Sequence, residues 1–500
     1  MTMKIQINKL DILFLGLIFL LSCQDAEIAP KEYPVVIMEE VSTSDSGAKF
    51  TANVTSLGNE TVSSYGFVWG DQPNLNIEID NSKSISSKLT TGNIVLEINS
   101  GLMKGQTYYV RPFIRTESML VYGSELPFTS EGSKPPEIFD FQPKFGSVGT
   151  SIEITGINFG FSAKSNTVLF GQYIATVDSA TDTKIYVKVP QVTEPGKVDI
   201  TVITAGMPVN SNDKFDIYFP WLKLSSTHNI NSASTSFTIA NSAYIINPNS
   251  STGWKFDSSN KTWQSFNLPQ NAGRYPKAFT ISNKGYALLE NGFYEYDPSS
   301  NAWAQKSDFP DNIIRDDYTF TMSFDQVGFI GFCYKNQKLW SYNPNKDTWI
   351  RKADFPEDFT KTTYPVWGSF SFTIENSGYL GVSQSAFAIN TFWKYDVATD
   401  SWESKTPLPS DAYGSYACMV IDGVAYVGLG SNFEWGDGYV SDEIWKYDQL
   451  NDSWRHFQNC PTSMSVNASF GIKDKGYVLS GSTRYSGILR EIWEFNPVEN

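Results

Sequence analysis

The motif Trp393-Lys394-Tyr395-Asp396, with Trp402 nine residues after its first Trp, is the clearest copy of a repeat in this 500-residue chain. It recurs almost unchanged as Trp445-Lys446-Tyr447-Asp448 with Trp454. Looser copies of the first four residues start at Trp254, Tyr294, Trp340 and Trp493. The copies start 40 to 53 residues apart. Self-similarity at such a period indicates a repeat architecture.

Each repeat has the pattern of a small antiparallel sheet of four strands. Two β-rich runs come first, separated by a turn with Gly, and we expect Gly285, Gly378, Gly423 and Gly476 in these turns. The third run carries the Trp-x-Tyr-Asp motif and ends in a turn such as 297–301, where Asp and Asn bond nearby backbone. The second Trp begins the fourth strand. Four short strands per repeat are typical of a propeller blade.

The repeat resembles the kelch motif, whose pattern has Gly-rich second strands, Tyr-Asp-Pro before a turn and Trp in the outer strand. The resemblance covers roughly residues 220–500 and implies a six-bladed β-propeller within residues 219–500. The sixth repeat reaches Pro497 without a second Trp, whereas Phe219–Leu224 has the character of an outer strand. We therefore expect residues 219–226 to pair with residues 488–497, so that strands from both ends of the segment close the propeller.

The first residues have the layout of a secretory signal peptide. Two lysines precede an apolar stretch that is too short to span a bilayer as a mature helix. Leu20-Leu21-Ser22-Cys23 resembles a bacterial lipobox, which implies a signal peptide over 1–22, lipidation of Cys23 and a lipid-anchored tether over 23–34. The acidic residues that follow resemble the export signal of Bacteroidetes surface lipoproteins. The resemblance implies an outer-membrane lipoprotein exposed on the cell surface; the alternative is an ordinary signal peptide with a chance Cys.

Two further β modules are expected before the repeats. Residues 35–131 contain short alternating runs separated by turn signals, which are typical of a β-sandwich. They resemble the fibronectin type III-like modules of Bacteroidetes surface proteins, with Tyr108 as a corner tyrosine and Trp69 in the core. Residues 135–218 resemble an IPT/TIG immunoglobulin-like domain in motifs such as 152–160. The expected fold class is all-β: two immunoglobulin-like β-sandwiches followed by a six-bladed kelch β-propeller.

The composition argues against nucleic acid as a partner and gives few candidates for catalytic or metal-binding residues. The net charge of −15 and the pI of about 4.7 argue against nucleic acid, which is bound through clustered Lys and Arg. His228 and His456 have no metal-ligand spacing, and the acidic residues around Asp437 do not match a calcium loop. We therefore assign no catalytic residue, no metal and no cofactor. Paired carboxylates of a glycosidase cannot be distinguished among so many acidic residues.

The candidate ligand-binding residues lie in loops that the repeat pattern does not require. In a four-stranded blade, the loops between strands two and three and those leading to the next blade emerge on the same face. Aromatic and Arg side chains on a rigid scaffold are typical of binding surfaces. The candidates are Arg274, Tyr275, Arg315, Tyr318, Tyr364, Trp367, Tyr413, Phe433, Trp435, Tyr439, Arg484 and Tyr485. For each of them, packing against the blades is the alternative role.

The leading functional hypothesis is a non-enzymatic surface lipoprotein that binds a glycan through this loop face, as part of a polysaccharide capture or uptake system. An outer-membrane transporter is then a candidate partner. The first alternative is an adhesion or assembly module that binds a surface protein. The second is a propeller enzyme that acts on carbohydrate.

Overall fold

The computed structural model describes residues 31–498 except for 225–227, 312–318, 335, 360–365, 385–389, 411, 413, 433–438, 484–486 and 489. The chain divides into two compact units, the first ending at Tyr218 and the second beginning at Phe219. The fold is all-β, as predicted: the described residues form strands and one short 3-10 helix, η1 (Ala163–Ser165). No helix in the described part is long and apolar enough to cross a membrane.

The N-terminal unit begins with two sheets that share one core. Their strand orders are β1-β2-β5 and β4-β3-β6-β7, and β8 also pairs with β6. The strands are β1 (Pro34–Ser44), β2 (Gly47–Leu57), β3 (Val62–Gly70), β4 (Asn81–Ser84), β5 (Gly92–Ile98), β6 (Thr107–Thr116), β7 (Leu120–Tyr122) and β8 (Leu126–Thr129). Trp69 is buried in this core beside Phe50, as predicted. The Tyr108 hydroxyl accepts a hydrogen bond from the Met103 N–H at 3.0 Å, which is the contact expected of a corner tyrosine.

The rest of the N-terminal unit is a second pair of sheets. Their strand orders are β10-β17-β16-β12-β13 and β14-β15-β11-β9. The strands are β9 (Glu137–Gln142), β10 (Phe145–Gly146), β11 (Ser151–Ile157), β12 (Asn166–Phe170), β13 (Tyr173–Ala175), β14 (Val177–Ala180), β15 (Lys184–Lys188), β16 (Gly196–Thr204) and β17 (Met207–Ile217). Phe141 and Phe170 both pack against Phe215, and all three rings are buried. Alternating burial along β11 and β15 follows the period of two that a half-buried strand requires.

In the C-terminal unit, residues 219–500, the described residues form six antiparallel sheets of four strands, here called sheets 1 to 6. Sheets 1 to 3 consist of β19 (Thr235–Ile239), β20 (Ser242–Ile246), β21 (Thr252–Asp257) and β22 (Thr262–Asn267); β23 (Lys277–Ile281), β24 (Lys284–Leu289), β25 (Gly292–Asp297) and β26 (Ala302–Gln305); and β27 (Thr319–Ser323), β28 (Gly328–Phe332), β29 (Leu339–Asn343) and β30 (Thr348–Lys352). Sheets 4 and 5 consist of β31 (Val366–Ile374), β32 (Ser377–Gln384), β33 (Asn390–Asp396) and β34 (Ser401–Lys405); and β35 (Ala417–Ile421), β36 (Val424–Gly428), β39 (Glu443–Asp448) and β40 (Ser453–Asn459). Two short hairpins pair β37 (Ser431–Asn432) with β38 (Tyr439–Val440) and β43 (Ser482–Thr483) with β44 (Gly487–Ile488).

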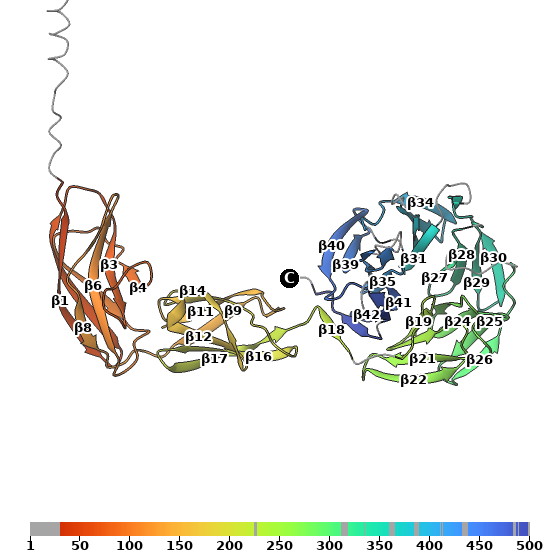
Figure 1. Cartoon of the computed structure of the whole chain (residues 1–500), viewed down its shortest axis with the longest axis horizontal. Helices are drawn as coiled ribbons and strands as arrows, with labels where there is room; N and C mark the ends of the chain where they lie inside the picture. Colours follow the sequence, from red (N-terminus) through yellow and green to blue (C-terminus); the bar gives the residue numbers. More distant parts are fainter. Residues whose placement is uncertain are drawn as a thin grey trace, which may run out of the picture. The chain divides into compact units, whose positions relative to one another are not determined.

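Sheet 6 draws its strands from both ends of this unit. Its order is β41 (Val466–Ile472), β42 (Lys475–Ser480), β45 (Ile492–Phe495) and then β18 (Trp221–Lys223). Trp221 pairs with Phe495 and Lys223 with Trp493, so the expected pairing of 219–226 with 488–497 is present. In Figure 1 the six sheets lie around a common centre, with first strands such as β19 and β35 inward and fourth strands such as β22 and β40 outward. The first strand of each sheet contacts that of the next, and β41 contacts β19.

The expected position of the glycines is wrong for three of the four. Only Gly423 lies in a turn with positive φ, at 76°. Gly285, Gly378 and Gly476 lie within second strands instead. A Cβ on Gly285 would come 2.1 Å from a ring carbon of Phe237, on the first strand of the preceding sheet. These glycines therefore make room for a large side chain from the neighbouring sheet, because only Gly leaves that space free.

Candidate functional site

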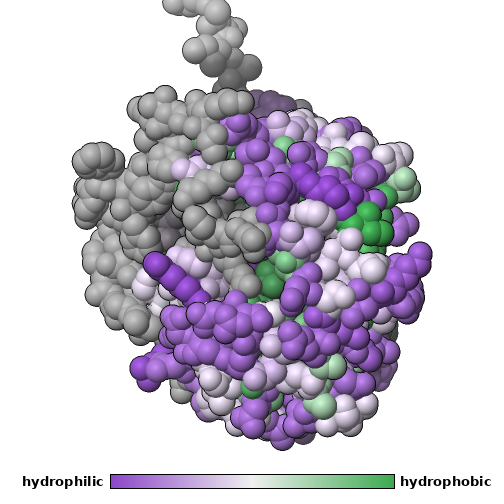
Figure 2. Space-filling view, turned by 90° about the vertical axis from the view of Figure 1, so that its right-hand side faces the viewer, coloured by the Kyte–Doolittle hydropathy of each residue, from purple (hydrophilic) through white to green (hydrophobic). Residues whose placement is uncertain are grey.

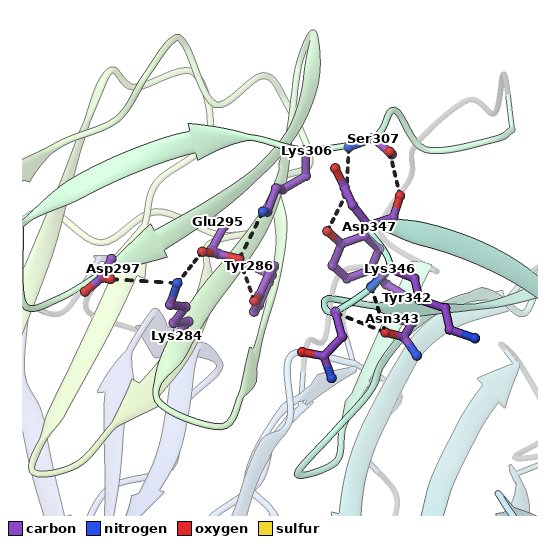
Figure 3. Close-up of polar contacts among 11 residues, drawn as sticks. Lys284, Tyr286, Glu295, Asp297, Lys306, Ser307, Tyr342, Asn343, Lys346 and Asp347 are labelled. Atoms are coloured by element: carbon purple, nitrogen blue, oxygen red, sulfur yellow. Dashed lines mark hydrogen bonds and ion pairs between the residues drawn. The ribbon is translucent and has the colours of Figure 1, made fainter.

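The repeat motif joins neighbouring sheets. In sheet 3 the Tyr342 hydroxyl donates a hydrogen bond to Asp347 at 2.6 Å, and Asp347 also accepts from the Ser307 N–H at 3.0 Å (Figure 3). Ser307 lies just beyond the fourth strand of sheet 2. The Trp349 indole donates to the Ser307 carbonyl at 3.1 Å. We call this arrangement of Tyr, Asp and second Trp the latch.

The latch repeats in the next two sheets. Equivalent tyrosine hydroxyls donate to Asp400 at 2.5 Å and to Asp452 at 2.8 Å, and these aspartates accept from backbone N–H groups of the preceding sheet. Burial alone would raise the pKa of Asp347, but the hydrogen bonds from Tyr342 and Ser307 lower it below 3.8. Burial, and then the bond to Asp347, raise the pKa of Tyr342. The Tyr, Asp and Trp residues of the latch therefore serve to join neighbouring sheets.

A second polar cluster in Figure 3 lies on sheet 2. Glu295 forms ion pairs with Lys284 at 2.5 Å and with Lys306 at 3.4 Å, and it accepts a hydrogen bond from the Tyr286 hydroxyl at 2.8 Å. Burial opposes ionisation of Glu295, but the bonds from Lys284 and Tyr286 outweigh it and lower the pKa of this carboxyl. The Lys284 ammonium also lies 3.8 Å from Asp297, so two carboxylates and two ammonium groups balance each other in this cluster.

The two ends of the sheets differ in their connections. At one end, here called the turn end, tight turns join strand one to strand two and strand three to strand four. At the other, the loop end, longer segments join strand two to strand three and lead to the next sheet. Of the predicted binding residues, Arg274 and Tyr275 lie at the loop end, in the segment that leads from sheet 1 to sheet 2. On the one face shown in Figure 2, the described surface is mostly hydrophilic, with small separate hydrophobic patches.

Arg274 and Tyr275 are the two predicted residues whose side chains the structure describes. The Arg274 guanidinium carbon lies 5.1 Å from the centre of the Tyr275 ring, within the range of a cation–π contact. Gly273 precedes them with a φ of 72°, and its carbonyl accepts a hydrogen bond from the Asn249 N–H at 2.8 Å. The loop 268–276 is therefore tied to the strand two to three connection of sheet 1, and it presents an exposed Arg beside a half-buried Tyr.

The other predicted residues cannot be placed in the same way. Trp367 lies in β31 and Tyr439 in β38, where Tyr439 pairs with Asn432, but their side chains are outside the described part of the chain. The remaining ones lie outside the described residues altogether: Arg315, Tyr318, Tyr364, Tyr413, Phe433, Trp435, Arg484, Tyr485 and the lipidation candidate Cys23. Their grouping into one surface stays a prediction.

A central cavity of about 270 Å³ lies among the first strands of all six sheets. Side chains on these strands bond the backbone carbonyls of the preceding sheet's first strand: Ser236 to Ser469, Thr280 to Thr238, Thr321 to Ala278, Ser371 to Thr321, Cys418 to Ser371 and Ser469 to Cys418. No charged side chain is among the described residues that line the cavity. These hydroxyl and thiol groups were not predicted, although aligning the repeats places a small residue just before Phe or Met in all six first strands: Ser236, Ala278, Thr321, Ser371, Cys418 and Ser469.

The described His, Cys and acidic side chains form no candidate metal site. Within the described ranges there is no group of three His, Cys, Asp or Glu side chains that could hold a metal. The His228 ring stacks on Trp254 at 3.6 Å, and His456 Nε2 lies 2.7 Å from the Asn459 side-chain oxygen. Burial raises the pKa of Glu357, between β30 and β31 at the loop end, while a hydrogen bond from the Trp393 indole opposes the shift. Sequence patterns gave no signal for Glu357.

Comparison with protein families identifies one domain of the chain. Residues 136–217 match the model of the IPT/TIG domain, in agreement with the predicted 135–218. No curated protein matches the chain.

Several solved structures are similar to the chain. An auxiliary nutrient binding protein from Bacteroides ovatus ATCC 8483 is 11% identical, with a TM-score of 0.41, and the match covers 73% of this chain and 99% of that one. A corresponding protein from Bacteroides thetaiotaomicron VPI-5482 is 12% identical, with a TM-score of 0.38 and coverage of 73% and 98%. A structural genomics protein of unknown function from the latter organism is 12% identical, with a TM-score of 0.37 and the same coverage. Likeness at this level carries no argument about function.

Proposed function

We propose that residues 219–500 form a six-bladed kelch-type β-propeller. Three observations support this: six four-stranded sheets, a cavity among their first strands, and a sixth sheet completed by β18. We propose further that residues 35–131 are a fibronectin type III-like module and that residues 135–218 are the full extent of the IPT/TIG domain. Limited proteolysis tests these boundaries: cleavage near 132–134 and 219 supports them, and cleavage first inside a module contradicts them.

The lipobox-like segment supports anchoring of the chain in the outer membrane through Cys23, with the rest at the cell surface. Replacement of Cys23 by Ser should abolish incorporation of labelled palmitate and release the protein from the membrane fraction. Protease treatment of intact cells should then degrade the wild-type chain. Full protection would place the protein on the periplasmic side of the membrane.

The function that the geometry supports best is binding of a glycan, without catalysis, at the loop end of the propeller. The exposed Arg274 beside Tyr275 on a tied loop carries this proposal. An aromatic ring can stack on the apolar face of a sugar, while a guanidinium supplies several hydrogen-bond donors. The neutral, hydroxyl-bearing central cavity suits uncharged polar groups better than acid–base chemistry.

Calorimetry against a panel of polysaccharides, with purified residues 24–500, tests this function. We expect one glycan class to bind and Tyr275→Ala to weaken its binding by about ten-fold, as loss of a stacking contact of about 1.4 kcal/mol would. Arg351→Ala is the matched control, because Arg351 lies over Trp340 at 5.5 Å on an outer strand. Absence of binding to every glycan, with capture of one surface protein, would favour the assembly role instead.

A further inference from the structure

The loop that leads to sheet 4 carries a carboxylate without the lysine partner that its counterpart in sheet 3 has. Asp311 follows a Phe-Pro pair in the loop to sheet 3, and Glu357 follows a Phe-Pro pair in the loop to sheet 4. Asp311 forms an ion pair with Lys338 at 2.7 Å. Lys338 lies two residues before the first residue of the repeat motif, and Thr391 occupies that position in sheet 4. The Glu357 carboxylate therefore has a threonine where Asp311 has a cation.

The position of Glu357 is fixed from two neighbouring sheets. Two residues earlier, the backbone N–H of Phe355 donates a hydrogen bond at 2.7 Å to the carbonyl of Gln337, which lies in the strand two to three connection of sheet 3. The buried Phe355 ring lies 6.0 Å from the ring of Trp393 in sheet 4. The Trp393 indole donates a hydrogen bond to the Glu357 carboxylate at 2.6 Å. This half-buried carboxylate is therefore held in place without a ligand, which lowers the entropic cost of binding one.

The bond to the indole does not by itself account for the carboxylate. Trp340 occupies in sheet 3 the position of Trp393, and its buried indole nitrogen has no hydrogen-bond partner among the described residues. A sheet can therefore form without a carboxylate at this indole. An ionised carboxylate has about four acceptor positions, and the indole of Trp393 uses one of those on Glu357. Glu357 thus keeps acceptor positions for a ligand.

The surroundings of Glu357 favour a cation as that ligand. Burial is the main influence on the pKa of Glu357 and raises it, while the two groups that oppose burial, the Trp393 indole and the Thr391 hydroxyl, are both neutral. A carboxylate removed from water without a positive partner is unfavourable, and a hydrogen-bonded cation offsets the lost hydration. The net charge of −15 also attracts cations to this chain. An ammonium beside Glu357 would take the place that the Lys338 ammonium has beside Asp311.

We propose that Glu357 is the subsite for the protonated amine of an amino sugar at the loop end. The choice of a sugar rests on the proposed glycan-binding function, and the choice of a cation rests on the comparison of Glu357 with Asp311. The sugar amine donates hydrogen bonds to the acceptor positions that the indole leaves available. A glycan whose amines are all acetylated lacks this cation and gains nothing from the charge of Glu357.

Calorimetric titration of residues 24–500 with cellotriose and the corresponding trimers of glucosamine and N-acetylglucosamine tests the subsite. The probes share their linkage and differ in one substituent, which is a hydroxyl, a protonated amine or an acetamide. The glucosamine trimer should bind most tightly. Glu357→Gln, which keeps an oxygen for the Trp393 indole, should weaken its binding about ten-fold, as loss of a hydrogen bond between charged groups does, and leave the other two probes unchanged. Asp311→Asn is the matched control and should change no affinity, since it removes the same charge from a carboxylate that pairs with Lys338.

Equal binding of the three trimers, or an unchanged preference for the amine in Glu357→Gln, would overturn the subsite and leave the glycan-binding function standing. Binding of another glycan, with none of the glucosamine trimer, would have the same meaning. If no glycan binds, the glycan-binding function fails and the sugar assignment fails with it. Trilysine then decides what the carboxylate does. Binding that Glu357→Gln weakens and Asp311→Asn does not would assign Glu357 to a lysine of a protein partner, whereas equal binding by both variants and wild type would leave it only the bond to the indole.

Discussion

Removal of the latch carboxylate by Asp347→Ala is the most informative test of how the sheets are held together. Asp347 accepts two hydrogen bonds, from the fully buried Tyr342 hydroxyl and from the Ser307 N–H. A hydrogen bond to a charged group contributes about 1.5–3 kcal/mol. Taking the lower value for each bond, we expect the free energy of unfolding of the C-terminal unit to fall by about 3 kcal/mol.

Urea unfolding followed by tryptophan fluorescence isolates this unit, because all of the 14 tryptophans except Trp69 lie in residues 219–500. Asp354→Ala is the control, since Asp354 is exposed and pairs only with Arg351 among the described ion pairs. A double-mutant cycle with Tyr342→Phe should give a coupling energy of about 2 kcal/mol. The reasoning is refuted if Asp347→Ala and Asp354→Ala unfold at the same urea concentration.

The same variant should change the dependence of stability on pH. The pKa of Asp347 is lower in the folded protein than its ordinary value of 3.8. The stabilisation that ionised Asp347 adds to the unfolding free energy is therefore complete above pH 3.8, and it is lost as the pH falls through the folded-state pKa. The difference in unfolding free energy between wild type and Asp347→Ala should be largest near neutral pH and shrink below about pH 4. A difference that grows in acid would contradict the assignment.

Three further predictions concern packing, the second Trp and the central cavity. Gly328→Ala should lower the free energy of unfolding by about 1–3 kcal/mol, because its Cβ would lie 2.0 Å from a ring carbon of Phe279. Adding Phe279→Leu should recover part of this loss in urea unfolding, and an unchanged stability of Gly328→Ala would contradict the packing role. Trp402→Phe removes the indole bond to the Ala353 carbonyl at 3.2 Å and should lower the unfolding free energy by about 1 kcal/mol, while an unchanged value would count against the latch. Because burial raises the pKa of Cys418 to about 12, this thiol should react with Ellman's reagent at pH 8 only after unfolding in urea; fast reaction of the folded protein would show an accessible thiolate.

The local part of the fold could be predicted from the sequence, because its signals lie within one repeat. The offset between the two tryptophans sets strands three and four, and the Asp and Asn residues form the expected turns. The pairing of Trp221 with Phe495 could also be predicted, since one outer strand lacked a repeat of its own. Gly285 was wrongly predicted to lie in a turn. A glycine is required at this position because the ring of Phe237, from the preceding repeat, packs against it. The spacing of residues within one repeat does not predict a contact between two repeats.

The candidate site was predictable only as a set of loops. Their location follows from the alternating direction of the strands, and Arg274 and Tyr275 lie at the expected end of the sheets. The cavity hydroxyls were not predicted because a single Ser or Thr in a strand gives no signal. Only alignment with the other five repeats shows that small residues recur at this position.

Hydrogen–deuterium exchange of the full chain, with and without a glycan that binds in calorimetry, tests the central claim most directly. If a neutral glycan binds at the loop end, its presence should slow exchange in residues 268–276, which carry Arg274 and Tyr275. Exchange in the strand three to four turns, such as 297–301, should stay the same. Protection confined to those turns, with none at the loop end, would contradict the proposed binding surface.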